Sequence, residues 1–306
     1  MSILSVIRKS LAAKVTVMLA VVLLVLTGIA TVIITMQQRQ QLEAATLEKA
    51  RLATAIGAQQ YGDLLETAVD SGALTIADLF DRNYVQIKGY NWGKNPKFHS
   101  KYDAVTDRLV PKLLDRVMGD DKDFIFAIGV DDHGYIPTHN TKFSQPVTGV
   151  PEKDLTGNRS KRIANYGEGI AAATNLEPSL LQVYKRNTGE TMWDVSSPIF
   201  VKGKHWGAMR VGVSMERIAA AQRALAFTLV GVFAVFLVAT IGVLFFVIRG
   251  AMRPVVALTA AAEQISLGEG LETPIKSASA DEIGMLTKAI DRLRSSMKAA
   301  MSRLGH

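Results

Sequence analysis

Side chains able to bind an anion are concentrated between residues 131 and 210 of this 306-residue sequence. Arginine presents a planar fork of N–H donors that matches a carboxylate, and aromatic side chains can form the walls of a pocket. Nine residues are the candidate ligand-binding positions: Asp131, Tyr135, His139, Asn140, Arg159, Arg162, Trp193, His205 and Arg210. Their chemistry predicts the binding of a small molecule, and a small organic anion in particular.

The same residues also allow a purely structural interpretation. Arg159 and Arg162 could pair with aspartates such as Asp154. Trp193 and Trp206 could belong to the hydrophobic core, where large aromatic side chains contribute much of the buried area. The sequence leaves these two interpretations open.

Histidine and cysteine usage argues against a metal or a cofactor. Four histidines fall in different predicted elements and lack the spacing of a zinc motif: His99, His133, His139 and His205. Without cysteine, the chain cannot form disulfides, a cysteine-ligated zinc site or a covalent haem attachment. We predict no metal and no cofactor, and non-covalent haem on His139 or His205 stays open.

The sequence contains no recognisable enzyme signature. It has no G-x-S-x-G nucleophile motif, no phosphate-binding P-loop and no kinase motif set. Adjacent aspartates at 120–121 and 131–132 are typical of solvated turns. The net charge of +7 does not form a basic stripe interleaved with aromatic residues. We therefore expect neither an enzyme nor a nucleic-acid-binding protein.

Two apolar stretches, residues 15–36 and 224–248, predict that the chain is anchored in a membrane. Neither contains a charged residue, and each reaches the roughly 20 residues that a helix needs to cross a bilayer. The first exceeds the apolar core of a signal peptide and has no clear cleavage site, so we interpret it as an uncleaved anchor. Basic residues flank the two stretches on their predicted cytoplasmic sides: Arg8, Lys9, Lys14, Arg249 and Arg253.

Because positive charge favours the cytoplasmic side, both termini are predicted to be cytoplasmic and residues 37–223 to lie outside. The predicted location is the bacterial inner membrane, with two passes. Basic residues next to the spans suit anionic headgroups, which makes membrane lipid an expected partner.

Residues 37–223 predict an α+β domain that begins with a long helix. Apolar residues recur at helical spacing over 37–69, although Gly57 and Gly62 weaken this prediction. Shorter helices are predicted at 74–85, 101–118 and 159–175.

An antiparallel sheet of about five strands is predicted in the same domain. Apolar runs bounded by short turns predict the strands: 124–130, 135–139, 180–185, 191–200 and 205–214. The first two are expected to form a hairpin. Residues 140–158, rich in Thr, Gly and Pro, predict a loop.

The residues after the second span have the most regular apolar pattern in the chain. Apolar positions alternate in steps of three and four along two helices: Val255, Leu258, Ala262 and Ile265, then Ile283, Leu286, Ile290, Leu293, Met297, Ala300 and Leu304. Pro254 fits a first helical turn, Gly268 and Gly270 end the first helix, and Asp281 can cap the second. One chain cannot bury two such narrow seams, so we predict a parallel homodimer that closes a four-helix bundle.

As a set, these features resemble a HAMP signal-relay domain. The set comprises Pro254, the two amphipathic helices, a glycine-containing connector with Leu271 and Ile275, and the sequence DEIG at 281–284. The resemblance implies that Pro254 and Glu282 serve the signal relay, with Glu282 fixing the second helix against the start of the first.

Two spans that enclose an outer domain and lead into HAMP resemble the bacterial chemoreceptors, or methyl-accepting chemotaxis proteins. The outer region is similar to their single-Cache, PAS-like sensor domains. Four stretches carry this similarity: 131–140 (DDHGYIPTHN), 154–162 (DLTGNRSKR), 181–194 (LQVYKRNTGETMWD) and 197–212 (SPIFVKGKHWGAMRVG). The resemblance implies chemotaxis-type signalling in response to an extracytoplasmic ligand.

The cytoplasmic hairpin of the chemoreceptors has no counterpart before the sequence ends at His306. We expect the output to lie in a cytoplasmic signalling partner, or the chain to be a shortened receptor or a fragment. The predicted domains are a cytoplasmic N-terminus (1–14), transmembrane helices (15–36 and 224–248), a sensor domain (37–223) and HAMP (249–304).

The sequence favours transmembrane signal transduction, in which ligand sensing outside is relayed through HAMP. The alternative is a non-sensing scaffold, or a truncated subunit that hetero-oligomerises with a partner carrying the output domain. An outer domain without a pocket would favour the alternative.

Overall fold

The computed structural model describes residues 11–119, 121–185, 189, 191–276 and 280–304. The chain divides into two compact units, which we name the sheet unit (Thr35–Leu225) and the span unit (Met1–Ile34 with Ala226–His306). A sheet domain between two membrane-length helices confirms the predicted α+β class. Most of the predicted N-terminal segment 1–14 lies outside the described residues.

Two long helices, α2 (Leu11–Asp70) and α8 (Met215–Ser266), contribute residues to both units. Each is long and apolar enough to cross a membrane. The predicted new helix at Pro254 is wrong, because Pro254 lies inside α8. A helix that began at Pro254 would have no Ser, Thr, Asp or Asn between Arg249 and Pro254 to cap its first backbone N–H groups. Because α8 continues through this segment, more of its backbone groups keep their hydrogen bonds than if a new helix began here.

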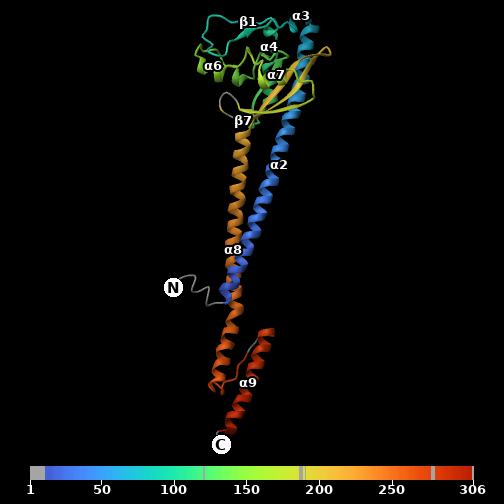
Figure 1. The fold of residues 1–306 in the computed structure, drawn as a ribbon. Helices are drawn as coiled ribbons and strands as arrows, with labels where there is room; N and C mark the ends of the chain where they lie inside the picture. Colours follow the sequence, from blue (N-terminus) through green and yellow to red (C-terminus); the bar gives the residue numbers. More distant parts are fainter. Residues whose placement is uncertain (1–10, 120, 186–188, 190, 277–279, 305–306) are drawn as a thin grey trace. The chain divides into compact units, whose positions relative to one another are not determined.

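A four-stranded antiparallel sheet, in the order β3-β8-β7-β6, forms the centre of the sheet unit (Figure 1). Its strands match four predicted ones to within a residue: β3 (Phe124–Asp131), β6 (Leu180–Lys185), β7 (Thr191–Val201) and β8 (Lys204–Ser214). In the β7–β8 turn, Lys202 and Gly203 have φ of 50° and 74°, as a tight two-residue hairpin requires. The predicted β6–β7 turn, residues 186–189, lies outside the described residues except for Gly189.

The fifth predicted strand does not form a ladder with this sheet and meets it only at one bridge, between His139 and Ile128 of β3. Instead, β4 (Tyr135–Ile136) pairs with β5 (Arg162–Ile163), while β3 pairs with β8. The Oδ1 atom of Asp131 accepts the N–H of Tyr135 at 2.8 Å, and the chain turns away at Gly134, where φ is 80°. The predicted 124–130/135–139 hairpin therefore forms only in part, as a single antiparallel bridge between Ile128 and His139.

The remaining helices of the sheet unit are short, and they differ in extent from the helices that the sequence predicts. They are α3 (Ile76–Leu79), α4 (Asp103–Leu109), α5 (Pro111–Met118), α6 (Pro151–Gly157) and α7 (Gly167–Ala173), with a 3-10 turn η1 (Thr141–Phe143). Pro111 divides the predicted helix 101–118, because proline has no N–H for the preceding turn. The predicted loop 140–158 contains η1 and α6.

Two predicted helices lose residues to short strands. The end of 74–85 enters β1 (Val85–Gln86), which pairs with β2 (Phe98–His99). The start of 159–175 enters β5. In both places the chain gains cross-strand backbone hydrogen bonds that a single-segment pattern does not reveal.

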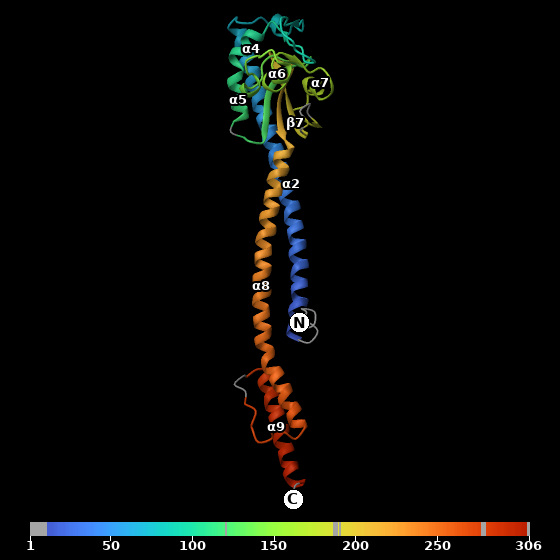
Figure 2. The same ribbon diagram turned by 90° about the vertical axis from the view of Figure 1, so that its left-hand side faces the viewer.

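Small residues bring α2 close to one face of the sheet. A Cβ on Gly62 would meet the backbone carbonyl of Phe200, and Gly57 lies against the side chain of Met209. The glycines that weakened the helix prediction are thus positions of close packing. Figure 2 shows α4 and α5 beside this part of α2, with α7 on the other side of the sheet.

Aromatic stacking fills the core on this α2 face. The ring of Tyr61 stacks on Trp206 with centroids 5.4 Å apart, and Tyr102 meets Trp206 edge-on at 5.7 Å. The Nε1 atom of Trp206 donates to the carbonyl of Leu79 at 3.1 Å. Trp206 is therefore a core residue, as the structural interpretation of the sequence held.

The ends of the two helices in the C-terminal part of the span unit match the prediction. Gly268 and Gly270 have positive φ just after α8, whose last carbonyls take the paired bonds of a Schellman motif. α9 (Glu282–Leu304) is capped by Asp281, whose Oδ1 accepts the N–H of Gly284 at 3.2 Å. Glu282 lies exposed in the first turn of α9.

The two predicted apolar seams are buried to different extents. On α8, Leu258 and Ile265 are buried. On α9, Leu286 and Leu293 remain 42% and 65% exposed, while Arg294 is buried. The α9 seam thus lacks full cover within one chain, which is typical of a helix that packs against a further helix.

Candidate ligand-binding site

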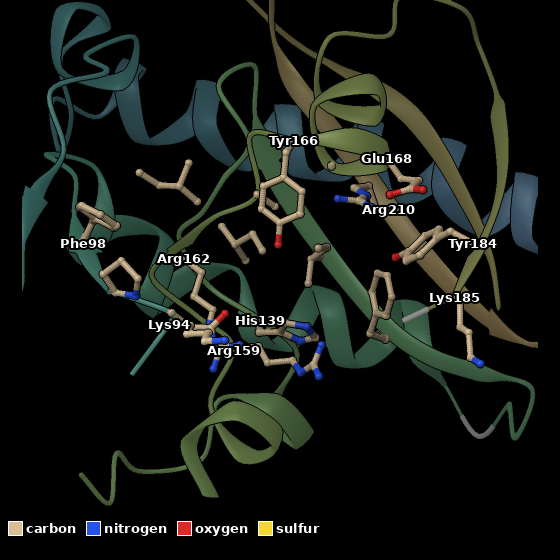
Figure 3. A pocket seen from close by; sticks show the side chains of 18 residues that line it. Lys94, Phe98, His139, Arg159, Arg162, Tyr166, Glu168, Tyr184, Lys185 and Arg210 are labelled. Atoms are coloured by element: carbon tan, nitrogen blue, oxygen red, sulfur yellow. The ribbon is translucent and has the colours of Figure 1, made fainter. Parts of the chain in front are cut away.

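A cavity of about 410 Å³ lies on the face of the sheet opposite α2 (Figure 3). Successive residues of β3 face opposite sides of the sheet. Gly129 lies under the Tyr61 ring of α2, whereas its neighbour Ile128 lines the cavity. The strands supply the floor, and residues 94–98 and 159–169 supply much of the wall. The volume falls within the roughly 300–1,000 Å³ of small-molecule sites.

Four of the nine predicted ligand-binding residues line this cavity: His139, Arg159, Arg162 and Arg210. They come from three separate segments of the sequence, since Arg159 and Arg162 share one, and these segments meet only in the folded chain. The other five do not line it, so the predicted set combines cavity residues with residues that support the fold.

Asp131 and Tyr135 belong to a buried polar network outside the cavity. The Oδ2 atom of Asp131 accepts the hydroxyls of Tyr84 (2.5 Å) and Tyr102 (2.6 Å), and Tyr135 donates its hydroxyl to Asp103 at 3.0 Å. Burial, and then the charge of Asp131, raises the pKa of Tyr102 well above its ordinary value, so Tyr102 remains a donor. This network ties the segments around α3 and α4 to the sheet.

Trp193 and His205 also lie away from the cavity. Trp193 is half-buried and packs against the α2-face core. His205 meets Phe200 edge-on with centroids 5.6 Å apart, and burial lowers the pKa of its imidazole. His205 is therefore neutral near pH 7 and supplies no cationic group.

His139 forms part of the cavity wall, with Asn140 behind it. Its ring is edge-on to Phe126 and Phe143, with centroids 5.9 and 5.0 Å away. The Nδ1 atom lies 2.6 Å from the Asn140 Oδ1 atom. Within the described parts of the chain, no group of three or more His, Asp or Glu side chains is placed to hold a metal ion.

Two arginines occupy one end of the cavity. Arg162 donates from Nη2 to the backbone carbonyls of Asp154 and Asn158, both at 2.7 Å. The guanidinium of Arg159 lies 5.7 Å from the centroid of the Phe143 ring. Guanidinium groups present the planar set of N–H donors that matches a carboxylate, so this end suits an anionic group.

Lys97 holds the adjoining wall in place. This buried side chain donates from Nζ to the Asn158 Oδ1 atom (2.6 Å) and to the Ser160 carbonyl (2.7 Å), which ties segment 94–98 to the arginine-bearing segment. Burial, and then the positive charge of Arg162, lowers the pKa of Lys97 to about 7.

At the other end, Arg210 is already paired. Its Nε donates to the Asp194 Oδ2 atom at 3.1 Å, and its Nη2 donates to the same oxygen. Tyr184 donates its hydroxyl to this carboxylate at 3.2 Å. Arg210 and Asp194 therefore form a buried ion pair. Burial alone would lower the pKa of Arg210, but the charge of Asp194 raises it above its ordinary value.

Several cavity residues were not predicted from the sequence: Lys94, Phe98, Tyr166, Glu168 and Tyr184. The charged residues Asp194 and Arg210, within otherwise apolar strands, were a signal of a buried polar pair. Lys94 lies in a segment without regular strand or helix pattern, Tyr166 and Glu168 lie in the predicted helix 159–175, and the place of all three at the cavity depends on the tertiary fold.

Comparison with known proteins adds a domain-level result. Residues 246–299 match the model of the HAMP domain family. This match covers the end of α8 and most of α9, in agreement with the resemblance found in the sequence. A HAMP domain directly after a membrane-length helix characterises a membrane-anchored protein of transmembrane signal transduction.

A comparison of structures found similarity to an extracellular ligand binding receptor from Desulfohalobium retbaense. The identity is 14%, the TM-score is 0.34, and the match covers 61% of this chain. The match spans 25% of the receptor's chain. The search of curated proteins found no match.

Proposed function

We propose that this chain is a chemoreceptor-like transmembrane sensor of the bacterial inner membrane. The sheet unit would act as a Cache-like extracytoplasmic domain that binds a small organic anion, with both termini in the cytoplasm. We assign it no catalytic activity. The observation that carries the proposal is the continuity of α8, which begins directly after β8 and ends within the HAMP-matching residues.

The same strand serves the cavity and the helix. Arg210 on β8 lies in the cavity floor, and β8 ends at Ser214, directly before Met215 begins α8. A ligand that favours one arrangement of the cavity floor would therefore act on the base of α8. It can shift the signalling equilibrium only by the difference between its affinities for the two states.

Homodimerisation through HAMP is part of the proposal. The exposed Leu286 and Leu293 on α9 would pack against a second copy, which is the arrangement predicted from the heptad pattern. A cytoplasmic partner would take up the output. The presence of a cavity supports the sensing function over the non-sensing scaffold, because a scaffold does not require a ligand-binding cavity with charged walls.

Cysteine crosslinking in the full chain tests the proposal. Because the natural sequence contains no cysteine, Leu286→Cys provides a single crosslinking site on the α9 seam. The full chain in lipid nanodiscs would be oxidised with and without acetate, pyruvate or succinate as probes. We expect an intersubunit crosslink whose rate changes with at least one anion.

The matched control carries Arg162→Gln in the same background, which removes a charge from the cavity and leaves the seam untouched. The ligand-dependent change should disappear while the basal crosslink persists. Absence of any crosslink would refute the homodimer, and a crosslink indifferent to every anion that binds would refute the relay.

A further inference from the structure

The connector between α8 and α9 has to return the chain to the start of a parallel helix. It comprises residues 267–281, of which 267–276 and 280–281 are described. A Cβ on Gly268, just after α8, would lie 3.2 Å from the Met301 side chain near the end of α9. The ends of the two helices thus lie close together, and the connector runs back along α9 (Figure 2).

Two side chains of α9, Asp291 and Arg294, hold the connector by its backbone. The Oδ1 atom of Asp291 accepts the N–H of Ile275 at 2.9 Å, and Arg294 donates from Nη1 to the carbonyl of Leu271. Arg294 also donates from Nε to the same Asp291 oxygen at 2.7 Å. The two side chains that hold the connector are therefore bonded to each other, and we name them the connector clamp.

Burial and charge distinguish the connector clamp from an ordinary surface ion pair. The Arg294 side chain is 8% exposed, and arginine is rarely buried unless it is paired. The hydrogen bond from Arg294, and then the one from the Ile275 N–H, lowers the pKa of Asp291, so this carboxylate is charged near pH 7. A second ion pair, Lys298 with Glu272, joins the same segments, but both of its side chains are exposed and such pairs contribute little.

The connector clamp is separate from the predicted dimer seam of α9. Leu286 and Leu293 belong to the apolar seam and are exposed, whereas Asp291 and Arg294 contact the connector. A substitution in the clamp can therefore release the connector and leave every seam residue in place.

We propose that Asp291 and Arg294 are positioning residues of the HAMP relay, which fix the connector to α9 so that α9 follows a displacement at the end of α8. A connector without these bonds would absorb the displacement, because coupling is carried by segments that are packed or hydrogen-bonded together. This inference rests on the proposed function, since it assigns residues to the relay. The clamp itself can be measured without any ligand.

Hydrogen–deuterium exchange of the full chain in lipid nanodiscs measures the clamp. Asp291→Ala removes the acceptor of the Ile275 N–H. Because a hydrogen bond to a charged group is lost, we expect this amide, in a peptide covering residues 271–276, to exchange about tenfold faster. Peptides from α9 should keep the exchange of the natural chain.

Two further variants are matched controls for this measurement. Asp291→Asn keeps an acceptor oxygen and should retain most of the protection of Ile275. Lys298→Gln removes the exposed ion pair with Glu272 and should change the exchange of Ile275 by less than about twofold. If Asp291→Ala leaves this exchange unchanged, or if Lys298→Gln accelerates it equally, the clamp is overturned.

Arg294→Gln provides a second test that leaves the Asp291 carboxylate in place, and it decides the matter if Asp291→Ala also exposes the amides of α9. Faster exchange over residues 271–276 with unchanged α9 peptides supports the clamp. Unchanged exchange over residues 271–276 overturns it.

Crosslinking at Leu286→Cys tests the role of the clamp in the relay, with acetate, pyruvate and succinate as probes. When Asp291→Ala is added, the basal crosslink and the calorimetric affinity for the anion should persist, and the anion-dependent change in rate should disappear. A change of the original size would overturn the positioning role. If no anion that binds alters the crosslink even without Asp291→Ala, the proposed relay fails and the positioning role with it, whereas the exchange result still shows whether the clamp exists.

Discussion

The two faces of the central sheet use opposite chemistry, although the same strands supply both. On the α2 face, Tyr61 stacks on Trp206 and small residues allow close backbone approach. On the cavity face, Arg210 and Asp194 form a buried ion pair and further charges line the wall. The α2 face thus holds the helix in a fixed position, and the cavity face suits a polar ligand. A single sheet can serve both purposes because successive side chains of a strand point to opposite faces.

The largest expected effect lies on the cavity face, at the buried pair. Asp194→Ala leaves the Arg210 guanidinium buried and uncompensated, which should lower the free energy of unfolding of the sheet unit by about 3–5 kcal/mol. All three tryptophans, Trp92, Trp193 and Trp206, lie in this unit, so tryptophan fluorescence in urea follows its unfolding within the full chain.

The double variant Asp194→Leu with Arg210→Met is the control. Replacing both charges by apolar groups should recover most of the lost stability, because no charge is left unpaired. If the double variant is no more stable than Asp194→Ala, the loss does not come from the uncompensated arginine.

On the α2 face, Gly62→Ala tests the close approach of helix and strand. The new Cβ would meet the Phe200 carbonyl, so we expect a loss of about 1–3 kcal/mol from overpacking. Helix propensity alone predicts the opposite sign, a gain of about 0.5–1 kcal/mol. A measured gain in the same fluorescence assay would show that α2 can move away from β7 at little cost.

Tyr61→Phe is expected to have a smaller effect with the opposite sign. The Tyr61 side chain is fully buried, and its hydroxyl has no hydrogen-bond partner within the described part of the chain. Removing that hydroxyl keeps the stacking on Trp206 and should stabilise the sheet unit by about 1 kcal/mol. A loss of stability would indicate a partner for this hydroxyl.

The last prediction concerns the pH dependence of stability at Lys97 on the cavity face. Its pKa is lowered from 10.5 to about 7 on folding, so above pH 7 the unfolded chain holds a proton that the folded chain lacks. The free energy of unfolding should therefore rise with pH between about 7 and 10 at this position. Relative to Lys97→Met, the natural chain should gain stability over that range, whereas Lys153→Met, at an exposed position, should follow the natural chain.

The sequence revealed the elements whose pattern is local. Uncharged length predicted the spans, alternation with short turns predicted β6, β7 and β8, and heptad spacing predicted the helices of the HAMP region. Predictions that depended on what an element meets elsewhere were less accurate. The predicted hairpin partner of β3 pairs with it at only one bridge, Ile128 with His139, and Pro254 lies inside α8 instead of beginning a new helix.

The candidate site divides in the same way. Arginine chemistry identified Arg159, Arg162 and Arg210 as cavity residues, because few side chains suit an anion so well. It did not reveal that Arg210 is already paired with Asp194 or that Glu168 stands beside it.

What this sequence determined by itself is therefore a matter of composition and periodicity: two spans, a sheet preceded by a long helix, and a HAMP pair. Only the tertiary structure decided which charges meet. Ion pairs and cavities form between residues distant in sequence, and their energies depend on separations of a few ångströms that no local pattern encodes. For that reason the pairing of Arg210 with Asp194 in the cavity floor appeared only in the folded chain.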